Sequence, residues 1–284
     1  MKNITRIALL VVIFALSGLS VALAHEGEHA AQQETAQTDA PAVTVDITAE
    51  GVVAPAEFAE GVNAVTFTNN SEAPSMPLIA RLNEGETVDS FMGAMANGPM
   101  AALPLVSLLG GTNIEPGASL TINYALQPGE YIIVDFNAEM PAPATFTVAD
   151  VEGEGAEGPA ADVTVSLLDF AFSIPLEIQA GEKVWQVQNL GNQWHEMVIA
   201  RVDEATAIGD YHDMLNAYMT AEDPEAAPFE DVAFWGPVNQ GERAWFPVTL
   251  EPGTYVVICF LPDIMGEGHS HFQMGMVQLI NVVE

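Results

Sequence analysis

LQPGEYIIVDF (residues 126–136) returns later in the chain as LEPGTYVVICF (250–260), and this pair of segments decides the fold. A second pair precedes it in the same order. VTFTNN (65–70) leads into PLIARL (77–82), and VWQVQN leads into EMVIARV, at 184–189 and 196–202. Because the matched segments recur in one order over half of the chain, we infer a duplicated domain rather than a short structural repeat.

Most segments of each half are predicted to be strands. Residues 163–167, 184–187 and 255–258 are rich in β-branched and aromatic side chains, which favour strands. Pro-Gly pairs supply turns between them, at 116–117, 128–129 and 252–253. Many short strands with such turns predict antiparallel β-sandwiches. Each half also contains one expected helical insertion, over about 86–108 and about 203–221.

The composition divides the chain into five parts. Residues 1–24 have a basic start, an apolar stretch and a small-residue cleavage site, which predicts a signal peptide and an extracytoplasmic protein. An uncleaved anchor is the alternative, because the apolar stretch approaches spanning length. A flexible acidic lead (25–41) follows, then a first domain (42–150), a Gly- and Glu-rich linker (151–161) and a second domain (162–284).

The charge of the chain is strongly negative. Six Lys and Arg residues stand against 39 Asp and Glu residues, a formal net charge of −33. Phosphate binding needs a basic face, so this balance excludes a nucleic-acid partner and disfavours an anionic membrane surface. High solubility is one interpretation of the charge, and electrostatic steering toward a basic partner is the other.

The end of the second half contains the residues of a candidate metal site. Cys259 is the only cysteine, and the segment GHSHFQMGMV follows it at 268–277. A copper site for electron transfer combines one thiolate and two imidazoles with a weak axial thioether. Cys259, His271 and Met276 can supply three of these four ligands. His195 is the best candidate for the second imidazole, because it directly precedes a predicted strand.

This pattern resembles the cupredoxins, the plastocyanin and azurin type of blue copper protein. In that family an early His precedes a strand, a Cys ends a late strand, and a loop often closes as H-x-x-x-G-M-V. HFQMGMV at residues 271–277 matches that motif. The resemblance implies two tandem cupredoxin-like Greek-key sandwiches, each with a short helical insertion. It also implies one type 1 copper, held by His195, Cys259, His271 and Met276.

The spacing of the loop leaves two ligands ambiguous. The gap from Cys259 to His271 is longer than in compact plastocyanin-like loops, and its Pro and Gly residues allow an excursion that returns to the site. His269 can therefore replace His271, and Met274 can replace Met276; the H-x-x-x-G-M match favours the later pair. For the partner of His195, Asn192 and Glu196 are the candidates, beside backbone groups.

The first half repeats the sandwich and lacks the ligands. Aligning the repeats puts Ser75 opposite His195 and Asp135 opposite Cys259. Residues without a thiolate and without His cannot form a type 1 copper site. We expect this half to be a structural or docking domain.

Two other copper sites are conceivable, at His25 with His29 and at Met92, Met95 and Met100. A flexible tail and a packed helix face, respectively, are the simpler interpretations.

Three functions compete. The first is one-electron transfer to an exported or membrane-bound redox partner, with the His271 edge nearest to solvent. The second is a metal-free or copper-delivery binding module. The third is a multicopper oxidase or nitrite reductase. It is disfavoured because such enzymes usually place a His next to the ligand Cys, where this chain has Phe260. We therefore expect an electron carrier that is not an enzyme.

Overall fold

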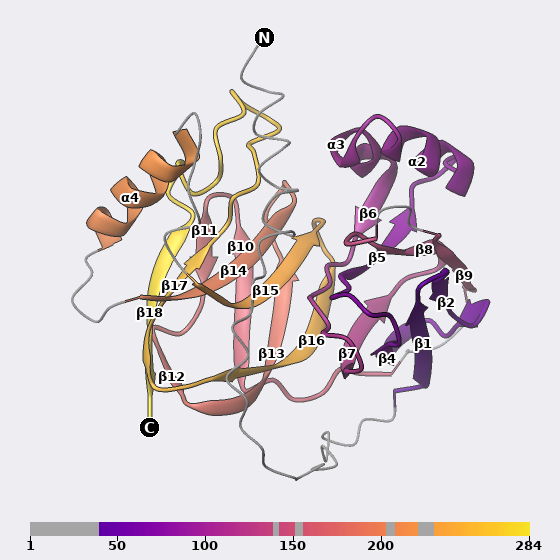
Figure 1. The fold of residues 1–284 in the computed structure, drawn as a ribbon, viewed down its shortest axis with the longest axis horizontal. Helices are drawn as coiled ribbons and strands as arrows, with labels where there is room; N and C mark the ends of the chain where they lie inside the picture. Colours follow the sequence, from indigo (N-terminus) through magenta and orange to yellow (C-terminus); the bar gives the residue numbers. More distant parts are fainter. Residues whose placement is uncertain (1–39, 139–141, 151–155, 203–207, 221–229) are drawn as a thin grey trace.

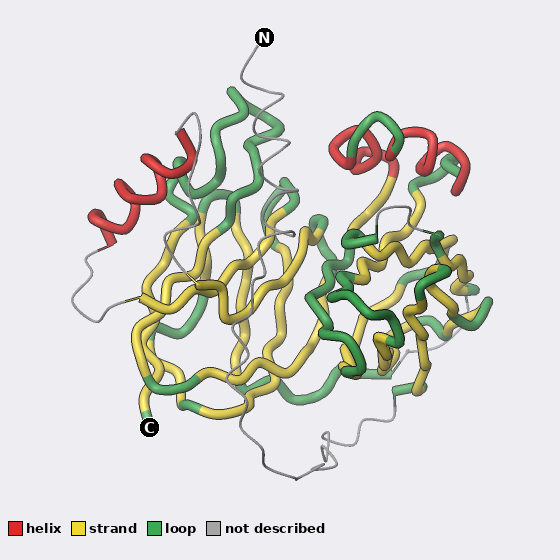
Figure 2. Tube along the Cα trace, in the orientation of Figure 1, coloured by secondary structure: helices red, strands yellow, loops and turns green. Residues whose placement is uncertain are grey.

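The computed structural model describes residues 40–138, 142–150, 156–202, 208–220 and 230–284. The predicted signal peptide (1–24), nearly all of the predicted lead (25–41) and the first part of the predicted linker (151–161) lie outside these residues. The candidate pair His25 and His29 lies outside them as well. Figure 2 shows that strands dominate the described chain and that short helices lie beside them.

The first half folds into two facing sheets. One contains, in order, β2, β1, β4 and β7, and the other contains β3, β9, β8, β5 and β6. The strands are β1 (Ala42–Thr48), β2 (Gly51–Val53), β3 (Glu57–Phe58), β4 (Gly61–Asn69), β5 (Pro77–Leu82), β6 (Val106–Leu108), β7 (Ser119–Leu126), β8 (Gly129–Asp135) and β9 (Ala144–Val148).

The second half repeats this order strand for strand. One sheet contains β11, β10, β13 and β16, and the other contains β12, β18, β17, β14 and β15. The strands are β10 (Val163–Leu168), β11 (Ala171–Ser173), β12 (Glu177–Gln179), β13 (Gly181–Asn189), β14 (His195–Val202), β15 (Glu230–Val238), β16 (Arg243–Leu250), β17 (Gly253–Ile258) and β18 (Val277–Val283). The predicted class of two tandem cupredoxin-like Greek-key sandwiches is confirmed. The expectation of purely antiparallel sheets is wrong, because β1–β4, β3–β9, β10–β13 and β12–β18 pair in parallel.

Alternation of side chains explains why these segments form sandwiches. In β9 and β10 every second residue is buried, so one face of each strand packs inward and the other meets solvent. The central strands β8 and β17 are buried almost throughout. Alternate residues of β17 join two separate apolar clusters, so its sheet is covered on both faces. The two sandwiches also have equivalent strand registers: Leu78 pairs with Val134 in the first, and the matching residues Val198 and Ile258 pair in the second.

The two sandwiches share one sheet. Strand β7 pairs antiparallel with β16, so the two four-stranded sheets continue as a single eight-stranded sheet (Figure 1). Side chains of both halves belong to one continuous apolar cluster. Across the boundary, the ring of Tyr124 lies 6.1 Å from that of Trp235, which in turn stacks on Phe246 at 4.1 Å.

Helices occupy the predicted insertions and lie toward the same end of the molecule in Figure 1. The first insertion contains α2 (Val88–Met95), α3 (Pro99–Ala102) and the 3-10 turn η1 (Leu103–Leu105). Its predicted extent to 108 is wrong, because residues 106–108 pair with β5 as strand β6. Met92 and Met95 pack partly buried against the core, which supports the packed helix face.

The second insertion contains α4 (Ile208–Thr220). This helix buries Tyr211 and Leu215 in a small apolar cluster with Phe260 and Phe272, so it covers the segment that follows β17. Within the residues that the structure describes, no helix combines the length and the apolar character needed to cross a bilayer.

Candidate metal centre

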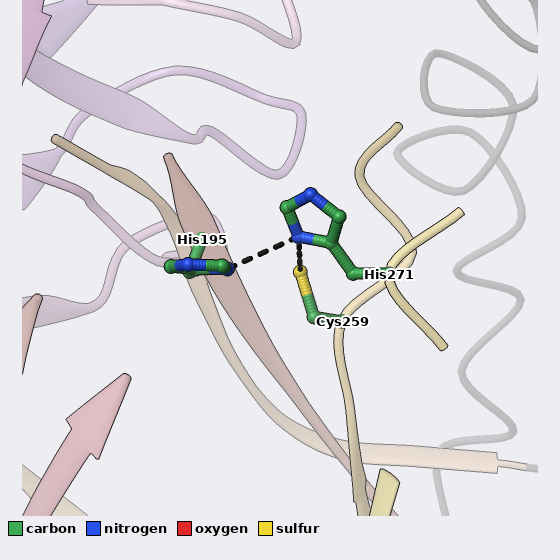
Figure 3. A group of neighbouring side chains, drawn as sticks. All are labelled: His195, Cys259 and His271. Carbon is green, nitrogen blue, oxygen red and sulfur yellow. Dashed lines mark hydrogen bonds between the residues drawn. The ribbon is translucent and has the colours of Figure 1, made fainter. Parts of the chain in front are cut away.

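The side chains of His195, Cys259 and His271 converge at one end of the second sandwich (Figure 3). His195 begins β14, and Cys259 directly follows β17, the neighbouring strand. Their ligand atoms and those of His271 all lie within 4.8 Å of one another. The two Nδ1 atoms are 3.0 Å apart, and Cys259 Sγ lies 3.4 Å from His271 Nδ1. One sulfur and two nitrogens therefore face a common point.

Backbone hydrogen bonds return the long loop to the site. Ser270 bridges to Pro262, and the Asp263 amide donates to the His269 carbonyl at 2.8 Å. Closer to the site, the His271 amide donates to Leu261 O at 2.7 Å, and the Phe272 amide donates to Cys259 O at 2.8 Å. The predicted excursion is thus a narrow hairpin, and its closure places His271 beside Cys259.

Burial distinguishes the alternative ligands. Met276 is fully buried, its amide donates to His271 O at 2.9 Å, and its carbonyl accepts from the Cys259 amide at 3.2 Å. Met274, by contrast, is 45% exposed. The side chain of His269 is 59% exposed and lies near Glu267, outside the cluster. The structure therefore favours the later pair, His271 and Met276, as the residues at the site.

Burial also sets the protonation of the three side chains. It lowers the pKa of His271 to about 4, with a further contribution from the nearby His195, and it lowers the pKa of His195. Both imidazoles are thus neutral near pH 7, as metal ligation requires. Burial, assisted by the Glu196 carboxylate, raises the pKa of the Cys259 thiol. A metal cation can overcome that cost, because a coordinating thiol is deprotonated.

Asp169 is the partner of His195, and sequence reasoning missed it. Its Oδ1 lies 3.2 Å from His195 Nε2. Asn192, one of the expected partners, instead donates to Asp169 through its amide at 2.8 Å and its Nδ2 at 2.6 Å. Glu196, the other, accepts from the Phe260 amide at 3.0 Å. Asp169 lies in the turn between β10 and β11, and no local pattern connects that turn to His195.

The expected solvent-facing edge of His271 is buried. His271 and His195 are both 0% exposed, so the prediction that His271 lies nearest to solvent is wrong. Phe170, which follows Asp169, packs edge-on against the His271 ring at 5.3 Å between ring centres. Its backbone has a φ of 64°, a left-handed conformation that is uncommon for a bulky residue. The β10–β11 turn therefore contacts both imidazoles.

The donor set fits type 1 copper. One thiolate and two imidazoles with a buried thioether beside them is the combination of that site, and Zn²⁺ would gain little from the thioether. The first sandwich has different chemistry at the equivalent positions. Its Asp135 Oδ1 accepts from the Met76 amide at 2.9 Å, whereas in the second sandwich Cys259 Sγ accepts from the Glu196 amide at 3.5 Å. Ser75, which aligns with His195, is also buried, so the first sandwich has side-chain oxygens where the second has a thiol and an imidazole.

Comparisons with known proteins give structural matches only. No protein-family model and no curated protein matches the chain. An auracyanin from Roseiflexus castenholzii is 19% identical and covers 45% of this chain and 100% of its own, with a TM-score of 0.32. Auracyanin A, a blue copper protein from Chloroflexus aurantiacus, is 19% identical over 42% of this chain and 96% of its own, with a TM-score of 0.30.

Another solved structure covers a larger share of this chain. A multi-copper oxidase from Pediococcus acidilactici is 12% identical and covers 86% of this chain and 58% of its own, with a TM-score of 0.23.

Proposed function

We propose that this chain is an exported blue copper protein that carries single electrons through one type 1 copper in its second sandwich and is not an enzyme. The observation that supports this proposal is the convergence of one buried thiol and two buried neutral imidazoles within 4.8 Å. Bound copper would supply a one-electron couple, because soft sulfur and imidazole ligands suit both of its oxidation states.

The chain's own part is to hold the donors in a fixed arrangement. His195 begins β14 and Cys259 directly follows β17, which pairs with β14, and backbone hydrogen bonds tie Met276 both to Cys259 and to His271. Such a frame resists rearrangement of the ligands, so little geometry changes when an electron enters or leaves. The complete burial of the three ligand side chains excludes water from the site and favours a resident metal over one that is passed on.

The proposed partner is a redox protein with a basic surface. The net charge of −33 would steer a cationic surface toward this chain and repel an anionic one. The basic start, apolar stretch and small-residue cleavage site of residues 1–24 support an extracytoplasmic location, in the periplasm, at the cell surface or secreted, and metal ligation would explain an unpaired Cys259 there.

The test is the visible absorption spectrum of the chain after addition of Cu(II). We expect an intense thiolate-to-copper charge-transfer band that is absent from Cys259→Ser and that bleaches and returns with one electron in a redox titration. A colourless wild-type protein with a freely titrating thiol would exclude the copper site. A protein that holds only Cu(I) and releases it readily to a competing chelator would instead establish copper delivery.

A further inference from the structure

The β10–β11 turn holds a carboxylate against one candidate ligand. Asp169 Oδ1 lies 3.2 Å from His195 Nε2, and its side chain is 30% exposed. Three donors fix this carboxylate: the amide and Nδ2 of Asn192, at 2.8 and 2.6 Å, and the Gln193 amide at 3.3 Å. These donors precede His195 in the same loop. The carboxylate and the imidazole are therefore held by one short segment of chain.

Gly191 makes room for this contact. A Cβ at residue 191 would lie 2.5 Å from Asp169 Oδ1 and 2.7 Å from His195 Nε2, closer than such contacts occur in proteins. Any side chain at this position would push the carboxylate and the imidazole apart. The absence of a side chain at residue 191 is thus a second feature of the site that serves the pair.

The contact determines which nitrogen of His195 is free for metal. A carboxylate accepts hydrogen bonds, so Nε2 of His195 carries the ring proton and donates a hydrogen bond to Asp169. Nδ1 of the neutral ring is then unprotonated, and it points to Nδ1 of His271, 3.0 Å away, and to the common point of the three ligands. Partners of this kind commonly fix the tautomer and raise the basicity of metal-ligating His residues.

We propose that Asp169 is a positioning residue that selects the metal-binding tautomer of His195 and whose negative charge favours oxidised copper at the site. The charge part rests on the copper function proposed above. A carboxylate beside the ligand stabilises Cu(II) more than Cu(I), because the oxidised ion is the more positive of the two. Loss of partners of this type typically weakens metal binding by roughly 10- to 100-fold.

Asp169→Asn and Asp169→Ala separate the two parts. Asn retains an acceptor for Nε2–H and removes the charge, so we expect Cu(II) affinity to fall roughly tenfold, with a smaller change for Cu(I) and a higher reduction potential. Ala removes the acceptor as well. In metal-free Asp169→Ala, nitrogen NMR of the imidazole should show that His195 no longer keeps its proton on Nε2 alone.

Two further variants serve as controls. Asp162→Asn makes the same chemical change at the other end of β10, where Asp162 accepts from the Val184 amide at 2.8 Å, and we expect wild-type potential and tautomer. Gly191→Ala keeps the charge and displaces it, so it should resemble Asp169→Ala in the NMR spectrum. Thermal melting of each variant checks that the sandwich is intact.

The outcomes separate the two proposals. If wild type shows the charge-transfer band and Asp169→Asn binds Cu(II) and Cu(I) as wild type does, the role of the charge is overturned. If metal-free Asp169→Ala keeps the proton of His195 on Nε2, the positioning role is overturned. If wild type binds no copper, the proposed function fails and the role of the charge fails with it. The NMR comparison still decides the positioning of His195.

Discussion

At the level of single residues, the two sandwiches share a backbone and differ in side-chain chemistry. The amide before β5, at Met76, donates to Asp135, and the equivalent amide at Glu196 donates to Cys259. In the first sandwich the acceptor is a carboxylate that also accepts from the Asn137 amide at 3.0 Å. Asp135 therefore closes the end of its sandwich with hydrogen bonds, where Cys259 presents a thiol to two imidazoles.

Substitution of Asp135 tests this structural role. Asp135→Ala leaves two backbone amides without their acceptor, and we expect a loss of about 1–3 kcal/mol in the free energy of unfolding. Asp135→Asn keeps an oxygen acceptor and should lose much less. Urea denaturation measures both. The copper absorption band should be unchanged in either variant, and equal stability of the Ala and Asn variants would contradict the assignment.

At the level of elements, helix α4 braces the loop that contains His271. Tyr211 and Leu215 are buried against Phe260 and Phe272, two residues that flank the candidate ligands. A hydrogen bond of 2.8 Å from Gln273 Nε2 to Asn216 Oδ1 adds a polar tie between the helix and the same loop. The stability of the loop therefore depends on a helix that lies about 50 residues earlier in the chain. The hydrogen-bonded residues Asn216 and Gln273 are 57 positions apart.

Truncation of the buried face of α4 should loosen this loop. Leu215 is fully buried, and Leu215→Ala is expected to cost about 2–5 kcal/mol, because it removes apolar contacts and leaves a cavity. Hydrogen exchange of the amides at 271–276 should become faster. Met214→Ala is the matched control on the same helix, since Met214 is 38% exposed and should change little. Unchanged exchange in Leu215→Ala would show that α4 does not support the loop.

At the level of the whole molecule, a partly buried contact between Arg81 and Glu242 connects the two sandwiches. Arg81 of β5 lies 3.3 Å from Glu242, which precedes β16 and is only 3% exposed at its side chain. Burial raises the pKa of Glu242 to about 7, although Arg81 acts in the opposite direction. The folded protein therefore binds the Glu242 proton more tightly than the unfolded chain, whose pKa is near 4.5.

The sign of the pH dependence follows from this shift. The stabilising contribution of protonated Glu242 is fully present below pH 4.5 and is lost as the pH rises through about 7. The loss approaches about 3 kcal/mol by the conversion of a pKa shift into free energy. Thermal midpoints measured from pH 4.5 to 8 should fall for wild type and fall less for Glu242→Gln. Parallel curves for the two proteins would contradict the prediction.

The amino-acid sequence alone identified the duplication, the all-β fold and the residues of the candidate site. Strand alternation and repeated segments are local signals, and a Cys, His and Met set with a loop motif shows its chemistry in its residue types. The same signals revealed that Ser75 and Asp135 stand where His195 and Cys259 stand in the second half. None of these inferences needed to know which distant segments touch.

Only the tertiary structure decided the contacts between distant segments. Asp169 meets His195 across 26 residues, and Arg81 meets Glu242 across 161. The burial of His271 under Phe170 and the pairing of β7 with β16 are of the same kind. Each of these contacts depends on how surfaces pack after the strands have formed. The local sequence pattern around a residue does not indicate which distant residue it will contact.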